Sequence, residues 1–107
     1  MFNKISIIGC GLIGSSILRA IEEKKLSIQI SAYDKSLSVT NYLKKNFSAE
    51  ICINISDVVK DSDLVIIASP LSSYKEILLS TQSNLKKNTI LTDTGSAKKE
   101  VNKIICN

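Results

Sequence analysis

A glycine-rich segment near the amino terminus has the residue types and spacing of a phosphate-binding loop. It follows the pattern G-x-G-x-x-G and consists of Gly9, Cys10, Gly11, Leu12, Ile13 and Gly14. Gly9 would permit a tight turn, Gly11 would let backbone N–H groups approach a pyrophosphate, and Gly14 would let a helix pack closely on a sheet. The amino terminus of that helix offers positive potential to phosphates. The segment therefore predicts a dinucleotide-binding loop.

An acidic residue follows at the distance that ribose recognition requires. Asp34 lies twenty positions after Gly14, at the end of a β-branched run, and Lys35 continues the loop. A carboxylate there would accept hydrogen bonds from the adenosine ribose and repel a 2′-phosphate, so NAD is favoured over NADP. The alternative is that the glycines only make a turn and that Asp34 only caps the next helix.

A second chemical segment, LTDTGSAKKEV, spans Leu91–Val101. It has the pattern of a strand that turns through a glycine into a helix, yet the helix opens with Lys98 and Lys99. Cations are unfavourable at a helix amino terminus unless an anion lies nearby. Lys98 is therefore either a ligand of a dianionic substrate or of the pyrophosphate, or a solvated surface residue.

Strand and helix patterns alternate along the chain and would bring these segments together. β-branched runs occur at Lys4–Ile8, Ile28–Tyr33, Glu50–Ile53, Leu64–Ala68 and Thr89–Thr92, and helical patterns at Leu12–Lys25, Ser36–Lys45, Ser56–Lys60 and Ser72–Leu85. Each β-branched run is nearly continuous in apolar character, which predicts strands buried on both faces. The alternation predicts one α/β domain over residues 1–107, a Rossmann-type doubly wound parallel sheet with strand order 3-2-1-4-5-6. Ligands of such sheets lie at the carboxyl ends of the strands, where the strand order reverses.

Two of the helical patterns predict more detail. In the first helix, Ile13, Ile17, Ala20 and Ile21 share one face and should be buried. In the last, Ser73 precedes Glu76 by three residues, which is a capping-box pattern.

Composition narrows the class of protein. Hydrophobic residues make up 44%, but no apolar run approaches the length of a membrane helix. The apolar stretch before Cys10 is too short for an export signal. The net charge of +4 comes from scattered lysine pairs, which fit helix ends better than nucleic-acid binding. Three cysteines without a C-x-x-C pair and no histidine indicate neither a metal site nor disulfides, and we expect a cytoplasmic protein with reduced thiols.

The sequence resembles the prephenate and arogenate dehydrogenase family. The resemblance rests on IIGCGLIGSSILRAI, AYDKS, SDLVIIASPLSSYKEIL and above all LTDTGSAKKEV. It implies a nucleotide-binding domain that precedes a helical dimerisation domain. It also implies oxidative decarboxylation of prephenate or arogenate, with hydride transfer to NAD, in tyrosine biosynthesis.

The resemblance also implies roles for individual residues. Ser69, Pro70 and Leu71 stand where the family's Thr-Pro-Val lines the nicotinamide. Ser96 matches a serine that orients the substrate, a role compatible with its alternative as a helix N-cap. Lys98 matches the lysine of the family's Gly-Ser-Val-Lys. The family's catalytic histidine, in a Gly-Gly-His-Pro segment, has no counterpart in these 107 residues, so we expect an incomplete, truncated domain that is inactive alone.

Two competing interpretations remain. A regulatory NAD-sensing module would use the same glycine pattern and acidic residue without catalysis, although the Gly95–Lys98 segment favours the dehydrogenase. Imino-acid reductases and hydroxyacid dehydrogenases share the fold but lack the Thr-Asp-Thr-Gly-Ser segment. An outer strand at Thr89–Thr92 without a partner would also favour a homodimer through the sheet edge.

Overall fold

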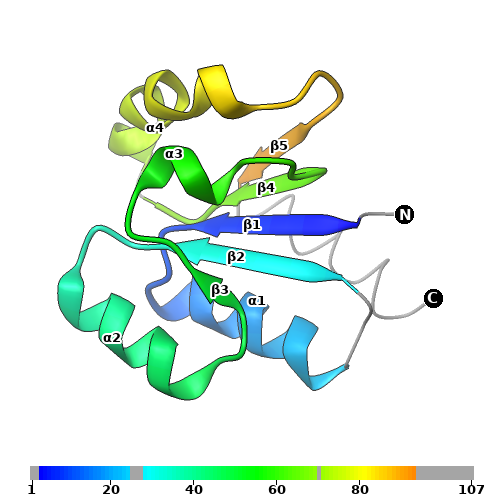
Figure 1. Ribbon diagram of the computed structural model, residues 1–107. Helices are drawn as coiled ribbons and strands as arrows, with labels where there is room; N and C mark the ends of the chain where they lie inside the picture. The colour runs from blue at the N-terminus through cyan, green and yellow to red at the C-terminus, as the bar shows by residue number, and fades with distance from the viewer. Residues whose placement is uncertain (1–2, 25–27, 70, 94–107) are drawn as a thin grey trace.

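Five parallel strands form a single sheet in the order β3-β2-β1-β4-β5 (Figure 1). The computed structural model describes residues 3–24, 28–69 and 71–93. The strands are β1 (Lys4–Ile8), β2 (Gln29–Tyr33), β3 (Glu50–Ile51), β4 (Leu64–Ile67) and β5 (Ile90–Asp93). The predicted Rossmann-type fold and the relative order of its first five strands are confirmed.

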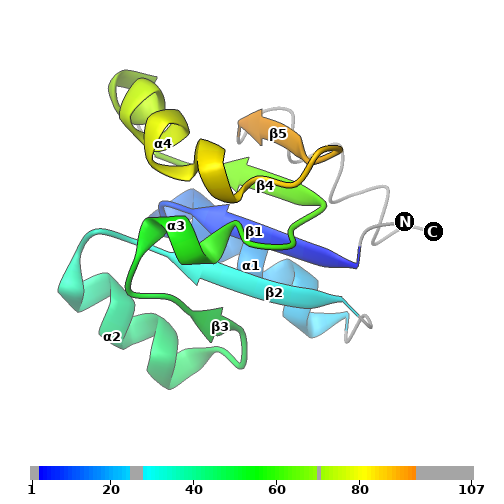
Figure 2. The ribbon, with the colours of Figure 1, turned by 45° about the horizontal axis from the view of Figure 1, so that its top comes forward.

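Helices cover both faces of the sheet (Figures 1 and 2). One face carries α1 (Leu12–Glu23) and α2 (Leu37–Asn46), and the other carries α3 (Ile55–Val58) and α4 (Tyr74–Thr81). Crossovers between parallel strands are right-handed as a rule, so the change of direction after β3 moves the later helices to the opposite face. The carboxyl ends of β1, β2 and β4 consequently open between the two helical layers. None of the helices in the described part of the chain is long and apolar enough to cross a membrane.

The core lies on both sides of the central strands. Ile5 and Ile7 of β1 pack with α1 and α2, whereas Ile8 packs with α3 and α4. Side chains alternate between the two faces of a strand, so a strand covered on both sides must be apolar along its whole length. β4 is buried at every position. This burial confirms the prediction for the central strands.

The outer strand β5 differs from that prediction. Ile90 is 47% exposed and Leu91 is 40% exposed, so β5 is not buried on both faces. Among the described residues β5 pairs only with β4. The homodimer expected through this edge stays a prediction.

The helices differ in detail from their sequence patterns. Ile13 is 49% exposed, while Leu18, which the periodicity did not select, is fully buried. The buried face of α1 is therefore turned away from Ile13. Ser73 is the N-cap of α4, as predicted, but its side chain makes no capping hydrogen bond. Short 3₁₀ turns at Leu71–Ser73 and Gln82–Asn84 replace the ends of the predicted long helix.

Candidate functional site

Two glycines of the loop after β1 are required by packing within the protein. Gly9 has φ +86°, and a Cβ there would lie 2.9 Å from the backbone nitrogen of Ser69. A Cβ on Gly14 would overlap the carbonyl oxygen of Gly9 and lie 3.3 Å from the Cβ of Ala68. The absence of a Cβ at both positions lets α1 lie close to β1 and to the end of β4, as the glycine pattern predicted.

Gly11 has a different surrounding. A Cβ at this position would meet no atom of the described part of the chain within 4 Å. Its φ of −67° is also accessible to other residues. Packing within the described chain therefore gives no reason for a glycine here. An external group that approaches the backbone would explain a glycine at this position. Gly11 lines a cavity at the carboxyl ends of the strands. The loop thus fits a dinucleotide.

Asp34 joins the glycine loop to the loop after β2. Its Oδ2 accepts a hydrogen bond from the N–H of Cys10 at 2.7 Å, and its Oδ1 accepts one from the N–H of Ser36 at 2.8 Å. Ser36, not Asp34, is the N-cap of α2, which corrects the capping alternative. A carboxylate oxygen can accept more than one hydrogen bond, so both oxygens keep capacity for ribose hydroxyls.

Cys10 contributes to the loop through its backbone. Its side chain is buried, and the thiol lies 3.6 Å from the carbonyl oxygen of Tyr33. Burial, with the nearby charge of Asp34, raises the pKa of the Cys10 thiol to about 12. The thiol is therefore protonated at neutral pH. The Cys10 N–H donates to the Asp34 carboxylate and helps to hold it in place. A contact between Cys10 and the cofactor stays a prediction.

A cavity of about 330 Å³ connects these groups at the carboxyl ends of the strands. It is lined by residues from the loops after β1, β2 and β4 and by two helices: Ile8, Gly9, Gly11, Tyr33, Asp34, Lys35, Ile55, Ala68, Ser69, Ser73, Glu76, Ile77 and Ser80. Gly9, Gly11, Asp34, Lys35 and Ser69 were selected from the sequence, and the structure brings them together. The cavity lies where the strand order reverses, which is the usual ligand position in this architecture.

Sequence reasoning missed the helical wall of the cavity. Ser73, Glu76, Ile77 and Ser80 recur at helical spacing and line it from α4 and the turn before it. That spacing could have marked one face of the helix, but only the packing of α4 over the sheet turns this face toward Asp34. Ile55 enters in the same way, from α3.

Several predicted site residues are not placed by the structure. Pro70, Ser96 and Lys98 lie outside the described residues, so their predicted roles stay predictions. Leu12 and Ile13 begin α1, and Leu71 begins the 3₁₀ turn after β4. Ile13 is exposed and does not line the cavity. No cluster suited to a metal ion occurs in residues 3–24, 28–69 and 71–93.

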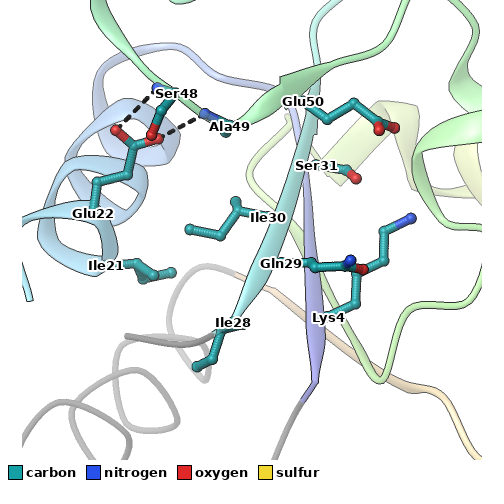
Figure 3. Close-up of a pocket in the computed structure, with 10 residues that line it drawn as sticks. All are labelled: Lys4, Ile21, Glu22, Ile28, Gln29, Ile30, Ser31, Ser48, Ala49 and Glu50. Carbon is teal, nitrogen blue, oxygen red and sulfur yellow. Dashed lines mark hydrogen bonds between the residues drawn. The ribbon is translucent and has the colours of Figure 1, made fainter. Parts of the chain in front are cut away.

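A larger cavity of about 580 Å³ lies toward the amino ends of β1 and β2 (Figure 3). There the carboxylate of Glu22 accepts the N–H groups of Ser48 at 3.2 Å and Ala49 at 2.9 Å, which fastens the end of α1 to the segment before β3. Lys4 and Gln29 line this cavity near the amino ends of β1 and β2. It contains no glycine loop. It also lies at the amino ends of the strands, whereas such sheets bind nucleotides at the carboxyl ends.

Comparison with known proteins identifies the family. The model of the family described as NADP oxidoreductase, coenzyme F420-dependent, matches residues 4–97. The chain belongs to this oxidoreductase family. Among curated relatives, the cyclohexadienyl dehydrogenase of Zymomonas mobilis is 36% identical over 98% of this chain and 36% of its own length. The L-aspartate dehydrogenase of Methanocaldococcus jannaschii is 34% identical over 92% of this chain and 38% of its own length.

The solved structures agree on the fold of this oxidoreductase chain. Prephenate dehydrogenase from A. aeolicus, in complex with hydroxyphenyl propionate and NAD⁺, superposes with a TM-score of 0.76 at 19% identity, over 98% of this chain and 39% of that one. The curated and the structural relatives together confirm the resemblance to prephenate and arogenate dehydrogenases. The chain spans about a third of the length of the curated relatives it matches. The shared part has the fold of an NAD(P)-binding domain.

Proposed function

We propose that this chain is the NAD-binding portion of a prephenate- or arogenate-type dehydrogenase. The observation that carries the proposal is the meeting of Gly11 and Asp34 in one cavity. The first position is open to a diphosphate, and the second holds a carboxylate suited to a ribose. The relationship to the cyclohexadienyl dehydrogenase of Zymomonas mobilis supports the choice of enzyme.

The residues of the glycine loop would bind and orient the cofactor. Gly11 is the N-cap of α1, and its first turn carries no acidic residue. Among the described residues, no side chain forms a capping hydrogen bond at this end. The N–H groups of this helix end, which have no partner within the helix, and its positive potential therefore suit the diphosphate. Bound NAD would supply the hydride acceptor. Ser69, at the end of β4, lines the same cavity and would contact the nicotinamide side.

We further propose that the domain prefers NAD to NADP. Backbone donors on both sides hold the Asp34 carboxylate in place, so it cannot turn away cheaply from a 2′-phosphate, and two negative charges would meet. NADH should bind at least about tenfold more tightly than NADPH, a difference of ~1.4 kcal/mol. Asp34→Asn should narrow this ratio. Asp61→Asn, at an exposed position, is the matched control. An unchanged ratio of NADH to NADPH affinity in Asp34→Asn would contradict the proposal.

A direct test of the cofactor site is calorimetric titration of the folded protein with NADH. Binding in the micromolar to low millimolar range is expected. No heat of interaction at millimolar NADH, on protein whose circular dichroism shows a folded state, would overturn the proposed function.

The substrate is the finer part of the proposal. Prephenate or arogenate should raise the melting temperature of the NAD-bound protein, with Ser96 and Lys98 as the proposed contacts. A role in tyrosine biosynthesis and a cytoplasmic location follow from this substrate class. The 107-residue sequence contains no histidine, and loss of a general base costs ~10²- to 10⁴-fold in rate. We therefore expect no ordinary turnover of prephenate and NAD by this polypeptide alone, and a coupled assay checks it.

Two other candidates have distinct outcomes in the same melting experiment. Protection by L-aspartate but not by prephenate or arogenate would favour the activity named for the Methanocaldococcus jannaschii relative. Protection by nucleotide alone would favour an NAD-sensing module without catalysis.

A further inference from the structure

The face of α4 that lines the nucleotide cavity combines an apolar centre with a polar rim. Ile77 is only 6% exposed and packs into the core with the partly buried Ile55 beside it. Glu76 and Ser80 lie on the same helix, line the same cavity and are exposed. Asp34 and its neighbours at the end of β2 line the same cavity.

The position of this face selects the part of a dinucleotide that reaches it. The argument rests on the proposed function, in which the glycine loop holds the diphosphate and Asp34 holds the adenosine ribose. The base attached to that ribose must then extend past Asp34, away from Gly11. The apolar lining of the cavity includes Ile55 and Ile77. Apolar side chains of this kind suit the faces of a flat purine ring.

We propose that Glu76 accepts a hydrogen bond from the exocyclic amine of the adenine and thereby selects 6-aminopurine over 6-oxopurine dinucleotides. An ionised carboxylate can only accept hydrogen bonds. The 6-amino group of adenine is a donor, whereas the 6-oxo group of hypoxanthine is an acceptor that the carboxylate repels. The hydroxyl of Ser80, one helical turn further along the same face, can donate or accept and does not discriminate.

The charges around Glu76 are mixed. Asp34 and Lys35 also line the cavity. The Asp34 carboxylate already accepts backbone N–H groups, and the ammonium group of Lys35 offsets part of the negative potential. A hydrogen bond to a charged acceptor at an exposed rim is expected to contribute roughly a 3- to 10-fold preference in binding.

The test compares NADH with nicotinamide hypoxanthine dinucleotide in its reduced form, by calorimetric or fluorescence titration of the full chain. The wild-type protein should bind the adenine form roughly 3- to 10-fold more tightly. Glu76→Gln should reduce the ratio to about twofold or less, because a carboxamide can also donate to the 6-oxo group. Glu23→Gln removes the same charge from an exposed site on α1, outside the cavity, and should keep the wild-type ratio.

The outcomes separate this proposal from the one on which it rests. Equal binding of both dinucleotides by the wild-type protein would overturn the role of Glu76 and leave the nucleotide site intact. An equal change in both affinities in Glu76→Gln would also overturn it, because a general charge effect acts on the diphosphate of either ligand. Failure of both dinucleotides to bind would overturn the role of Glu76 together with the proposed function. Unchanged melting of Glu76→Gln without ligand verifies that the variant is folded.

Discussion

Substitution of Gly11 and of Gly14 by alanine should separate binding from stability within one loop. A methyl group on Gly11 would meet no atom of residues 3–24, 28–69 and 71–93 within 4 Å, whereas one on Gly14 would overlap the carbonyl oxygen of Gly9. The first variant should fold normally and lose affinity for the cofactor. The second should lose stability.

The magnitudes follow from these surroundings. At Gly11, loss of a favourable N-cap residue costs about 0.5–1 kcal/mol, and reduced entropy of the unfolded chain returns about 0.4–1 kcal/mol. The net change in unfolding free energy should stay within about 1 kcal/mol. At Gly14, helix propensity contributes up to ~1 kcal/mol in favour of alanine. Against it stands overpacking onto Gly9, whose N–H is bonded to the carbonyl oxygen of Tyr33 at 2.8 Å.

Overpacking of a tight backbone contact costs about 1–3 kcal/mol and sometimes more. We therefore expect Gly14→Ala to melt several degrees below the wild-type protein, at roughly 4 °C per kcal/mol for a domain of this size. Gly11→Ala should melt within about 4 °C of the wild-type protein. Its affinity for NADH should fall at least about tenfold, or ~1.4 kcal/mol, because the methyl group occupies the approach of the diphosphate.

The assay is differential scanning fluorimetry without ligand, followed by calorimetric titration with NADH on all three proteins. A Gly11→Ala protein that melts below Gly14→Ala would refute the packing argument. Wild-type affinity in Gly11→Ala would refute the placement of the diphosphate.

Three further predictions concern the rest of the chain. The pKa of Cys10 is raised to about 12 and that of Cys52 to about 11, mainly by burial, so both thiols should resist iodoacetamide at pH 8 until the protein unfolds, as peptide mapping by mass spectrometry can show. The hydrogen bond from Lys86, with backbone N–H groups, lowers the pKa of Asp63 from 3.8 to about 2, so its stabilisation is present above about pH 4 and is lost as the pH falls toward 2. Asp63→Asn should lower the free energy of unfolding at pH 7 and remove this contribution to acid sensitivity. Urea denaturation at a series of pH values measures both effects. The argument is contradicted if the free energies of unfolding of the two proteins change with pH in the same way. Light scattering at high concentration tests the homodimer expected through residues 89–92, which a monodisperse monomer would exclude.

Much of the fold could be predicted because its signals are local. A strand buried on both faces must be apolar throughout, and a helix needs apolar residues at three- and four-residue spacing, so the alternation along the chain indicated the architecture. The exposure of β5 could not be predicted in this way. Its β-branched pattern marks a strand, but the exposure of Ile90 and Leu91 depends on what packs against the sheet edge, which no local pattern encodes.

The candidate site could likewise be predicted only in part from local sequence patterns. The spacing of Gly9, Gly11 and Gly14, with Asp34 one strand later, indicated a nucleotide loop because a turn and a helix start are determined by neighbouring residues. The spacing did not show which glycine serves packing and which leaves room for a ligand. Whether a glycine serves packing or a ligand depends on Ala68 and Ser69, more than fifty positions away.

The sequence by itself determined the alternating elements, the glycine loop and its carboxylate, since each is a property of a few neighbouring residues. Only the tertiary structure decided that Asp34 holds the Cys10 N–H, that the Cys10 thiol is buried and that Glu76 on α4 faces the same cavity as Gly11. These are contacts between segments far apart in the chain. Their geometry is created by the packing of helices on the two faces of the sheet, so it exists only in the folded molecule.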